Sequence, residues 1–160
     1  MFGISSLGWV HTLGSLPAIP AAAYMFVRHG RIFPRSPAGI FYFCTMMIGI
    51  LTIPLIAHKP ESYVIAAATL SFLLVGYCVG LLPGFTRSKT YIETIALSVT
   101  VFLLMVPATT ETLRRVPNGH PFVSDLKSPI LLGAQGALFV ALLMGLTFQL
   151  IQLSRKSSRQ

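Results

Sequence analysis

Acidic residues are scarce in this sequence. The 160 residues include 4 Asp and Glu, against 12 Lys and Arg and 4 His. With so few carboxylates, we find no pair spaced for general acid–base catalysis. The sequence also lacks a Gly-rich phosphate loop, a His-Glu-x-x-His run and a Ser-His-Asp set with sensible geometry. No motif therefore commits the chain to a reaction, and the sequence favours a protein without enzymatic activity.

Cysteine and charge are also in short supply. Cys44 and Cys78 are the two cysteines, and both lie within apolar runs, so a disulfide framework is excluded and we expect buried thiols. Charged residues make up 10% of the chain and hydrophobic residues 54%, whereas about a quarter of an ordinary soluble domain is charged. A soluble fold of this size could not bury so much apolar surface. The composition therefore predicts an integral membrane protein.

Long apolar runs are what the sequence does contain. A membrane-spanning helix needs about 20 mostly apolar residues, and five segments meet this requirement: 7–27, 38–57, 62–83, 91–110 and 129–153. Pro17 and Pro20 interrupt the first segment, and no positively charged stretch precedes it, so we expect a retained helix and not a cleaved signal peptide. The sequence thus predicts one all-α domain, a bundle of about five transmembrane helices with an outer loop at 111–128 and a tail at 154–160.

The formal net charge of +8 is distributed in short clusters between the apolar runs. There is no basic stripe and no RNA-binding motif, so we expect contact with a lipid bilayer and not with nucleic acid. The positive-inside rule then places the N-terminus outside and the tail in the cytoplasm. Eight basic residues fall on the tail's side (Arg28, Arg31, Arg35, Arg87, Lys89, Arg155, Lys156 and Arg159) and four on the other (Lys59, Arg114, Arg115 and Lys127).

Small residues recur at four-residue spacing in three of the predicted spans. Helices in lipid associate through such residues, because small side chains let two backbones approach closely. We expect these faces to pack inside the chain, and homodimerisation through the last span is the alternative. The positions are Gly14, Ala18 and Ala22 in the first span, Gly76 and Gly80 in the third, and Gly133, Ala137, Ala141 and Gly145, followed by Gln149, in the fifth.

Three histidines are predicted on the outer side of the membrane. His11 lies about one turn inside the first span, His58 closes the second span, and His120 lies in the outer loop. Neutral imidazole is a common ligand of haem and metals, so these residues are the candidate cofactor-binding set. In the alternative, His11 bonds a neighbouring backbone or hydroxyl group, and the other two lie among the headgroups.

Two carboxylates are expected to form ion pairs at helix ends. Glu93 closely follows Arg87 and Lys89, which predicts a pair at the level of the headgroups. Glu111 is expected to pair with Arg114 or Arg115. The arginines between the first two spans are expected to face headgroups, either binding acidic lipids or serving as topology determinants; these are Arg28, Arg31 and Arg35.

Three motifs follow one another in the first third of the chain: WVHTLG at 9–14, RHGR at 28–31 and PAGIFY at 37–42. In this pattern a helix beginning with a histidine leads through a basic turn to a Gly-x-x-Tyr helix entry. The pattern resembles a family of small bacterial multi-span membrane proteins of unknown function. The resemblance implies a location in the bacterial inner membrane and implies no activity.

Three functional interpretations follow. The first is a non-enzymatic protein that serves as an accessory subunit of a larger membrane complex. The second is a haem- or metal-binding redox protein that uses His11 with His58 or His120. The third is a small carrier, which is disfavoured because neither an inverted repeat nor a charge in the middle of a span is visible.

Overall fold

The computed structural model describes residues 5–57, 59–84, 86–117 and 120–157, and all regular structure in these segments is helical. Five helical segments are long and apolar enough to cross a membrane, which confirms the predicted all-α membrane bundle. They are α1 (Ser6–Ser15) with α2 (Ala18–His29), α3 (Pro37–Ile56), α4 (Pro60–Cys78) extended by the 3-10 turn η1 (Val79–Leu81), α5 (Thr86–Arg115) and α6 (Pro129–Ser157).

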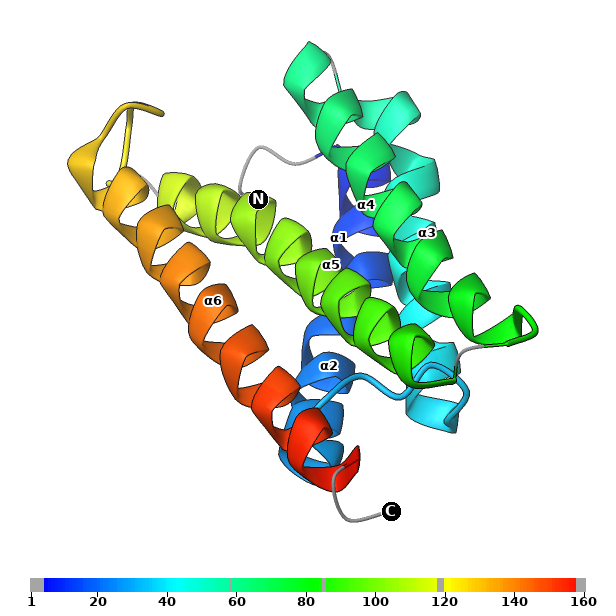
Figure 1. Cartoon of the computed structure of the whole chain (residues 1–160). Coiled ribbons are helices and arrows are strands. Elements are labelled where there is room, and N and C mark those ends of the chain that lie inside the picture. The colour runs from blue at the N-terminus through cyan, green and yellow to red at the C-terminus, as the bar shows by residue number, and fades with distance from the viewer. Residues whose placement is uncertain (1–4, 58, 85, 118–119, 158–160) are drawn as a thin grey trace.

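The first span is interrupted where the prolines predict. Helix α1 ends at Ser15 and α2 begins at Ala18. Pro17 lies between them and has no backbone N–H to donate, so the hydrogen-bond ladder cannot continue through it. Pro20 lies in the first turn of α2, where a missing N–H has no consequence. The two short helices therefore follow one another as a broken span behind α5 (Figure 1).

Helices α5 and α6 are longer than the sequence predicts. Helix α5 runs on to Arg115, so the assignment of residues 111–115 to the outer loop was wrong. Glu111 and Arg115 lie one turn apart, and their Oε2 and Nε atoms are 2.5 Å apart, as the predicted ion pair requires. The helix ends before Pro117, because a proline disfavours helical geometry in the residue before it. Likewise, α6 continues into the predicted tail as far as Ser157.

Helix α5 lies in the middle of the bundle. It packs against α4 on one side and α6 on the other, while α3 packs against α1, α2 and α4 (Figure 1). The core lies between α2, α3, α4 and α5, where Met25, Tyr42, Leu73 and Leu97 are fully buried. Helix α6 lies at the edge of the bundle, and α5 is its main neighbour.

Successive spans alternate in direction, so the loops meet at two opposite ends. We call one of them the basic end: it contains residues 28–36, 79–84, 86–90 and 149–157, which carry seven of the eight basic residues predicted on the tail's side. The Arg35 guanidinium lies beside Gly80 and the Gln152 side chain beside Gly30, and these contacts join the segments. At the opposite end, the Val123 N–H donates to the Leu113 carbonyl, which ties the loop before α6 to the end of α5.

The small residues of the first and third spans lie at helix contacts. A Cβ atom added to Gly76 would lie 2.5 Å from Leu97 Cδ2, and one added to Gly80 would overlap the Arg35 guanidinium. Ala18 and Ala22 are buried in the core, and a Cβ atom on Gly14 would lie 2.5 Å from Ile48 Cγ2. At Gly14 and Gly76 two helices therefore approach too closely for a larger residue, whereas Gly80 lies beside a side chain of the loop after α2.

The four small residues of α6 do not pack in this way. A Cβ atom on Gly133 or Gly145 would meet nothing within 4 Å, and Ala137 and Ala141 are exposed. The prediction that this stripe packs inside the chain was therefore wrong. Helix α6 contacts α5 through longer side chains instead, so no helix packs closely against the small residues. Gln135 Nε2 donates to Thr110 Oγ1 at 3.2 Å, the Phe139 ring contacts that of Phe102, and Gln149 bonds Ser98. Homodimerisation through α6 stays a prediction.

Candidate functional site

A buried ion cluster occupies the basic end of the bundle. Glu93, near the start of α5, is 5% exposed. Its Oε1 lies 2.8 Å from Arg31 Nη1 and its Oε2 lies 3.5 Å from Arg35 Nη1. The expected pairing of Glu93 with a near neighbour in sequence was wrong for Lys89, whose ammonium contacts the Leu82 carbonyl instead; the side chain of Arg87 lies outside the described residues. Packing turns Glu93 toward the interior, where the loop after α2 supplies its partners.

Beside this cluster lies a polar hollow of about 320 Å³, which we call the basic pocket. The Arg31 guanidinium lies 4.6 Å from the centre of the Phe33 ring, and His29 contacts the same ring. Arg28 is exposed, and no carboxylate in the described part of the chain lies within ion-pair distance of it. The side chains that define the basic pocket are Arg28, His29, Arg31, Phe33, Gln149 and Gln152.

The three arginines predicted to face headgroups therefore differ. The exposure of Arg28 fits the prediction, and the Arg35 side chain is 52% exposed although it also reaches Glu93. The Arg31 side chain is 17% exposed and is directed at Glu93. Arg31 is therefore less exposed than the other two, because a buried carboxylate from another helix holds it, although it also lines the basic pocket.

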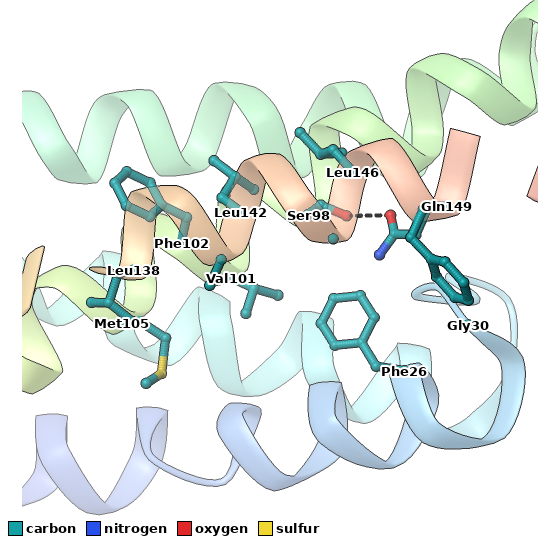
Figure 2. A pocket seen from close by; sticks show the side chains of 13 residues that line it. Phe26, Gly30, Ser98, Val101, Phe102, Met105, Leu138, Leu142, Leu146 and Gln149 are labelled. Carbon is teal, nitrogen blue, oxygen red and sulfur yellow. Dashed lines mark hydrogen bonds between the residues drawn. The ribbon is translucent and has the colours of Figure 1, made fainter. Parts of the chain in front are cut away.

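A second hollow of about 390 Å³ lies between α2, α5 and α6, and we call it the apolar groove. Phe26 of α2 and Val101 of α5 point into it, and Leu138 and Leu142 line it from α6 (Figure 2). Its polar members lie together at one end, where Ser98 Oγ donates to Gln149 Oε1 at 2.8 Å. The groove is thus apolar along the membrane spans and becomes polar as it nears the basic end.

The two hollows adjoin at Gly30 and Gln149, which line both. Gly30 has a φ of +72° and its N–H donates to the Phe26 carbonyl, a left-handed cap that ends α2. A Cβ atom there would lie 3.0 Å from Gln152 Oε1. Glycine at position 30 therefore permits the left-handed turn and leaves room for the Gln152 side chain of α6. Figure 2 shows the side-chain nitrogen of Gln149 turned away from Ser98, toward Phe26.

The predicted histidine site is only partly described. His11 Nδ1 lies 2.7 Å from Thr52 Oγ1, and this hydroxyl donates to the Ile48 carbonyl, so His11 is the donor. This geometry realises the alternative in which His11 bonds a nearby hydroxyl group. The residue also lines a hollow of about 140 Å³ with Ser15 and Thr69.

The other two histidines are not brought to His11 by any described contact. The backbone N–H of His120 donates to the Pro117 carbonyl in the loop before α6, and His58 lies outside the described residues. Among the residues that the structure describes, no group of three His, Cys, Asp or Glu side chains could hold a metal ion. The three-histidine site therefore stays a prediction.

The sequence reasoning missed Ser98 as a site residue and considered Gln149 only as the end of a small-residue stripe. Both are polar side chains inside long apolar runs, where an unpaired polar group is costly. The cost of an unpaired polar group within a span was the signal that could have identified these two residues. It shows that such residues need partners, but it does not tell which helix supplies the partner, since Ser98 and Gln149 are 51 residues apart in the chain.

No family model, curated protein or solved structure matches this chain. Its class is therefore defined by the fold: it is a multi-pass α-helical membrane protein.

Proposed function

We propose that this chain is a non-enzymatic protein of the bacterial cytoplasmic membrane that holds an amphiphilic molecule between α2, α5 and α6. The observation that carries the proposal is that the apolar groove and the basic pocket adjoin at Gly30 and Gln149, which line both. An amphiphile has the same two parts in the same order, an apolar chain and a polar head. The groove lies along membrane spans and the pocket lies at their end, which matches how a lipid stands in one leaflet.

Energetics assign different roles to the two hollows. Lipid tails are as apolar as leucine, so moving an acyl chain from the bilayer into the apolar groove gains little hydrophobic energy. The groove therefore contributes shape and packing against side chains such as Phe26 and Leu142. Affinity above that for bulk lipid comes from the polar contacts of the headgroup in the basic pocket.

The location and orientation in this proposal rest on the charges and on the resemblance. Residues 28–36, 79–84, 86–90 and 149–157 meet at the basic end, and a cytoplasmic excess of Lys and Arg is the general rule for membrane proteins. This supports a cytoplasmic basic end and an N-terminus outside. The resemblance of residues 9–42 to small bacterial membrane proteins supports the bacterial inner membrane.

A matched pair of α6 variants tests the proposal. Gly145 lines the apolar groove, whereas Gly133 lies outside it, and a Cβ atom at either position meets nothing within 4 Å. Gly145→Leu should therefore fold and fill the groove, and Gly133→Leu should fold and leave it open. The probe is a phospholipid with a photoactivatable diazirine on its acyl chain, reconstituted with the protein in vesicles, and the crosslinked peptides are mapped by mass spectrometry.

We expect the parent protein to crosslink on the α2, α5 and α6 peptides that line the groove. Gly145→Leu should lose most of this labelling and Gly133→Leu should retain it. Equal labelling of both variants, or labelling spread evenly over all lipid-facing helices, would show that the apolar groove holds no lipid in preference to the bilayer.

The accessory-subunit, redox and carrier interpretations stay predictions. Copurification of a stoichiometric partner would favour the first. A haem absorption band that disappears in His11→Ala would favour the second.

A further inference from the structure

We propose that the amphiphile is an anionic phospholipid and that Arg28 selects it by its charge. The inference rests on the proposed function, since it names the headgroup that occupies the basic pocket. The evidence for it is separate, however, because it comes from the charges of the basic pocket and not from the shape of the apolar groove.

The first step is the charge balance of the basic end. Glu93 divides its single negative charge between Arg31 and Arg35, so these three side chains together carry one net positive charge. Arg28 adds a second, and no described carboxylate lies within ion-pair distance of it. The other three acidic residues of the chain, Glu61, Glu111 and Asp125, belong to segments at the opposite end. The pocket therefore has an uncompensated positive charge, which an anionic headgroup neutralises and a zwitterionic one does not.

The second step concerns the hydrogen-bond donors that line the basic pocket. Glu93 engages Nη1 of Arg31, and the guanidinium lies over the Phe33 ring, so Arg31 is held in one orientation while its remaining N–H groups stay available for a phosphate. Gln149 and Gln152 add amide N–H donors on the α6 side of the pocket. A phosphodiester offers several acceptor oxygens at once, and these donors come from both the loop after α2 and α6.

The third step distinguishes a lipid from a soluble anion. Arg28 is exposed at the surface, where a free phosphate would compete with water and salt. A headgroup whose acyl chain lies in the apolar groove is delivered to the pocket at high effective concentration. Because the groove and the pocket adjoin at Gly30 and Gln149, an acyl chain in the groove places its headgroup beside the pocket.

Native mass spectrometry in a neutral detergent tests the inference, because a neutral micelle has no surface potential of its own. The probes are phosphatidylglycerol and phosphatidylcholine with identical acyl chains. The test variant is Arg28→Gln and the charge-matched control is Arg155→Gln, since Arg155 is an exposed residue of α6 that does not line the pocket. Both variants remove one positive charge at the basic end, and neither removes a described ion pair.

We expect the parent to bind phosphatidylglycerol in preference to phosphatidylcholine. Arg28→Gln should reduce this preference about tenfold, as the loss of one charge-assisted hydrogen bond implies. Arg155→Gln should change the preference less than about twofold, since it removes only a distant, screened charge. Arg28→Lys, which keeps the charge, should retain most of the preference.

Two outcomes would overturn the inference. Equal binding of the two lipids by the parent would show that the pocket does not select charge, yet the groove proposal would survive if Gly145→Leu still lowered the binding of both. Displacement of phosphatidylglycerol by an equal concentration of inorganic phosphate would show that the pocket takes a soluble anion and not a lipid.

Discussion

The carboxylate of Glu93 on α5 lies 2.8 Å from the guanidinium of Arg31, which belongs to the loop after α2. The pair connects the middle helix of the bundle to the turn that separates the first two spans. It also fixes one wall of the basic pocket, because the same guanidinium lines that hollow. The stability of the basic end and the shape of the basic pocket are therefore linked through one buried carboxylate.

We predict that Glu93→Gln destabilises the protein strongly. The substitution keeps the size of the side chain but leaves the mostly buried Arg31 without a counter-charge, and removing one partner of a buried pair costs about 3–5 kcal/mol. The measurement is the midpoint of unfolding in mixed micelles of dodecyl maltoside and SDS, followed by circular dichroism. The control is Glu111→Gln, whose exposed pair with Arg115 should contribute at most about 1 kcal/mol. Similar shifts in the two variants would contradict a special role for Glu93.

How much of this arrangement the sequence predicts depends on the range of the interaction. The five spans follow from apolar length, and the Glu111–Arg115 pair follows from helical spacing, so both are local properties. The partner of Glu93 lies 62 residues away in sequence, and no local pattern singles out Arg31 over Lys89. A small-residue stripe likewise shows that close packing is sterically feasible, but not that a helix is present opposite it. For this reason the prediction held at Gly76 and was wrong at Gly133.

The apolar groove could not be predicted for a related reason. Its walls come from α2, α5 and α6, and its existence depends on the way α6 contacts α5 at Gln135, Phe139 and Gln149 while leaving a space beside α2. Each wall residue, such as Phe26 or Leu142, is an ordinary apolar residue in its own span. Only the distances between helices turn these residues into a hollow.

A second prediction concerns the buried hydroxyl pair of Tyr42 and Thr100, whose oxygens are 2.9 Å apart. Thr100 donates its hydrogen to the Leu97 carbonyl, so Tyr42 is the donor of the pair. Tyr42→Phe leaves the Thr100 hydroxyl bonded to Leu97 and should cost about 1 kcal/mol. Thr100→Val leaves the fully buried Tyr42 hydroxyl without its acceptor and should cost about 1–3 kcal/mol. Unfolding midpoints of the two variants in mixed micelles provide the comparison, and a larger loss for Tyr42→Phe would reverse the donor assignment.

A third prediction concerns the contact between Gly76 of α4 and Leu97 of α5. A methyl group at position 76 would overlap Leu97, which is fully buried and cannot move aside, so Gly76→Ala should destabilise by about 1–3 kcal/mol. Adding Leu97→Ala should make the double variant less destabilised than the sum of the single changes, because the cavity accommodates the new methyl group. Gly133→Ala is the control, and it should be neutral or slightly stabilising, since nothing lies near that position in the chain and alanine favours helix. A clear loss of stability in Gly133→Ala would point to a second copy packed on α6.

The last prediction tests which end of the bundle faces the cytoplasm. Cys44 and Cys78 are exposed on the helix surfaces and not buried as the sequence suggested, so both are first replaced by serine to remove their reactivity. Single cysteines are then introduced as Lys127→Cys, in the loop before α6, and as Arg155→Cys, at the basic end; both positions are exposed. If the excess of basic residues keeps its end in the cytoplasm, a membrane-impermeant maleimide should label Lys127→Cys in cells with an intact inner membrane. Arg155→Cys should react only after the membrane is opened. The opposite pattern would place the basic pocket on the outer face, where the cytoplasmic leaflet could not supply its lipid, and labelling at both positions in intact cells would show that α6 does not separate two compartments.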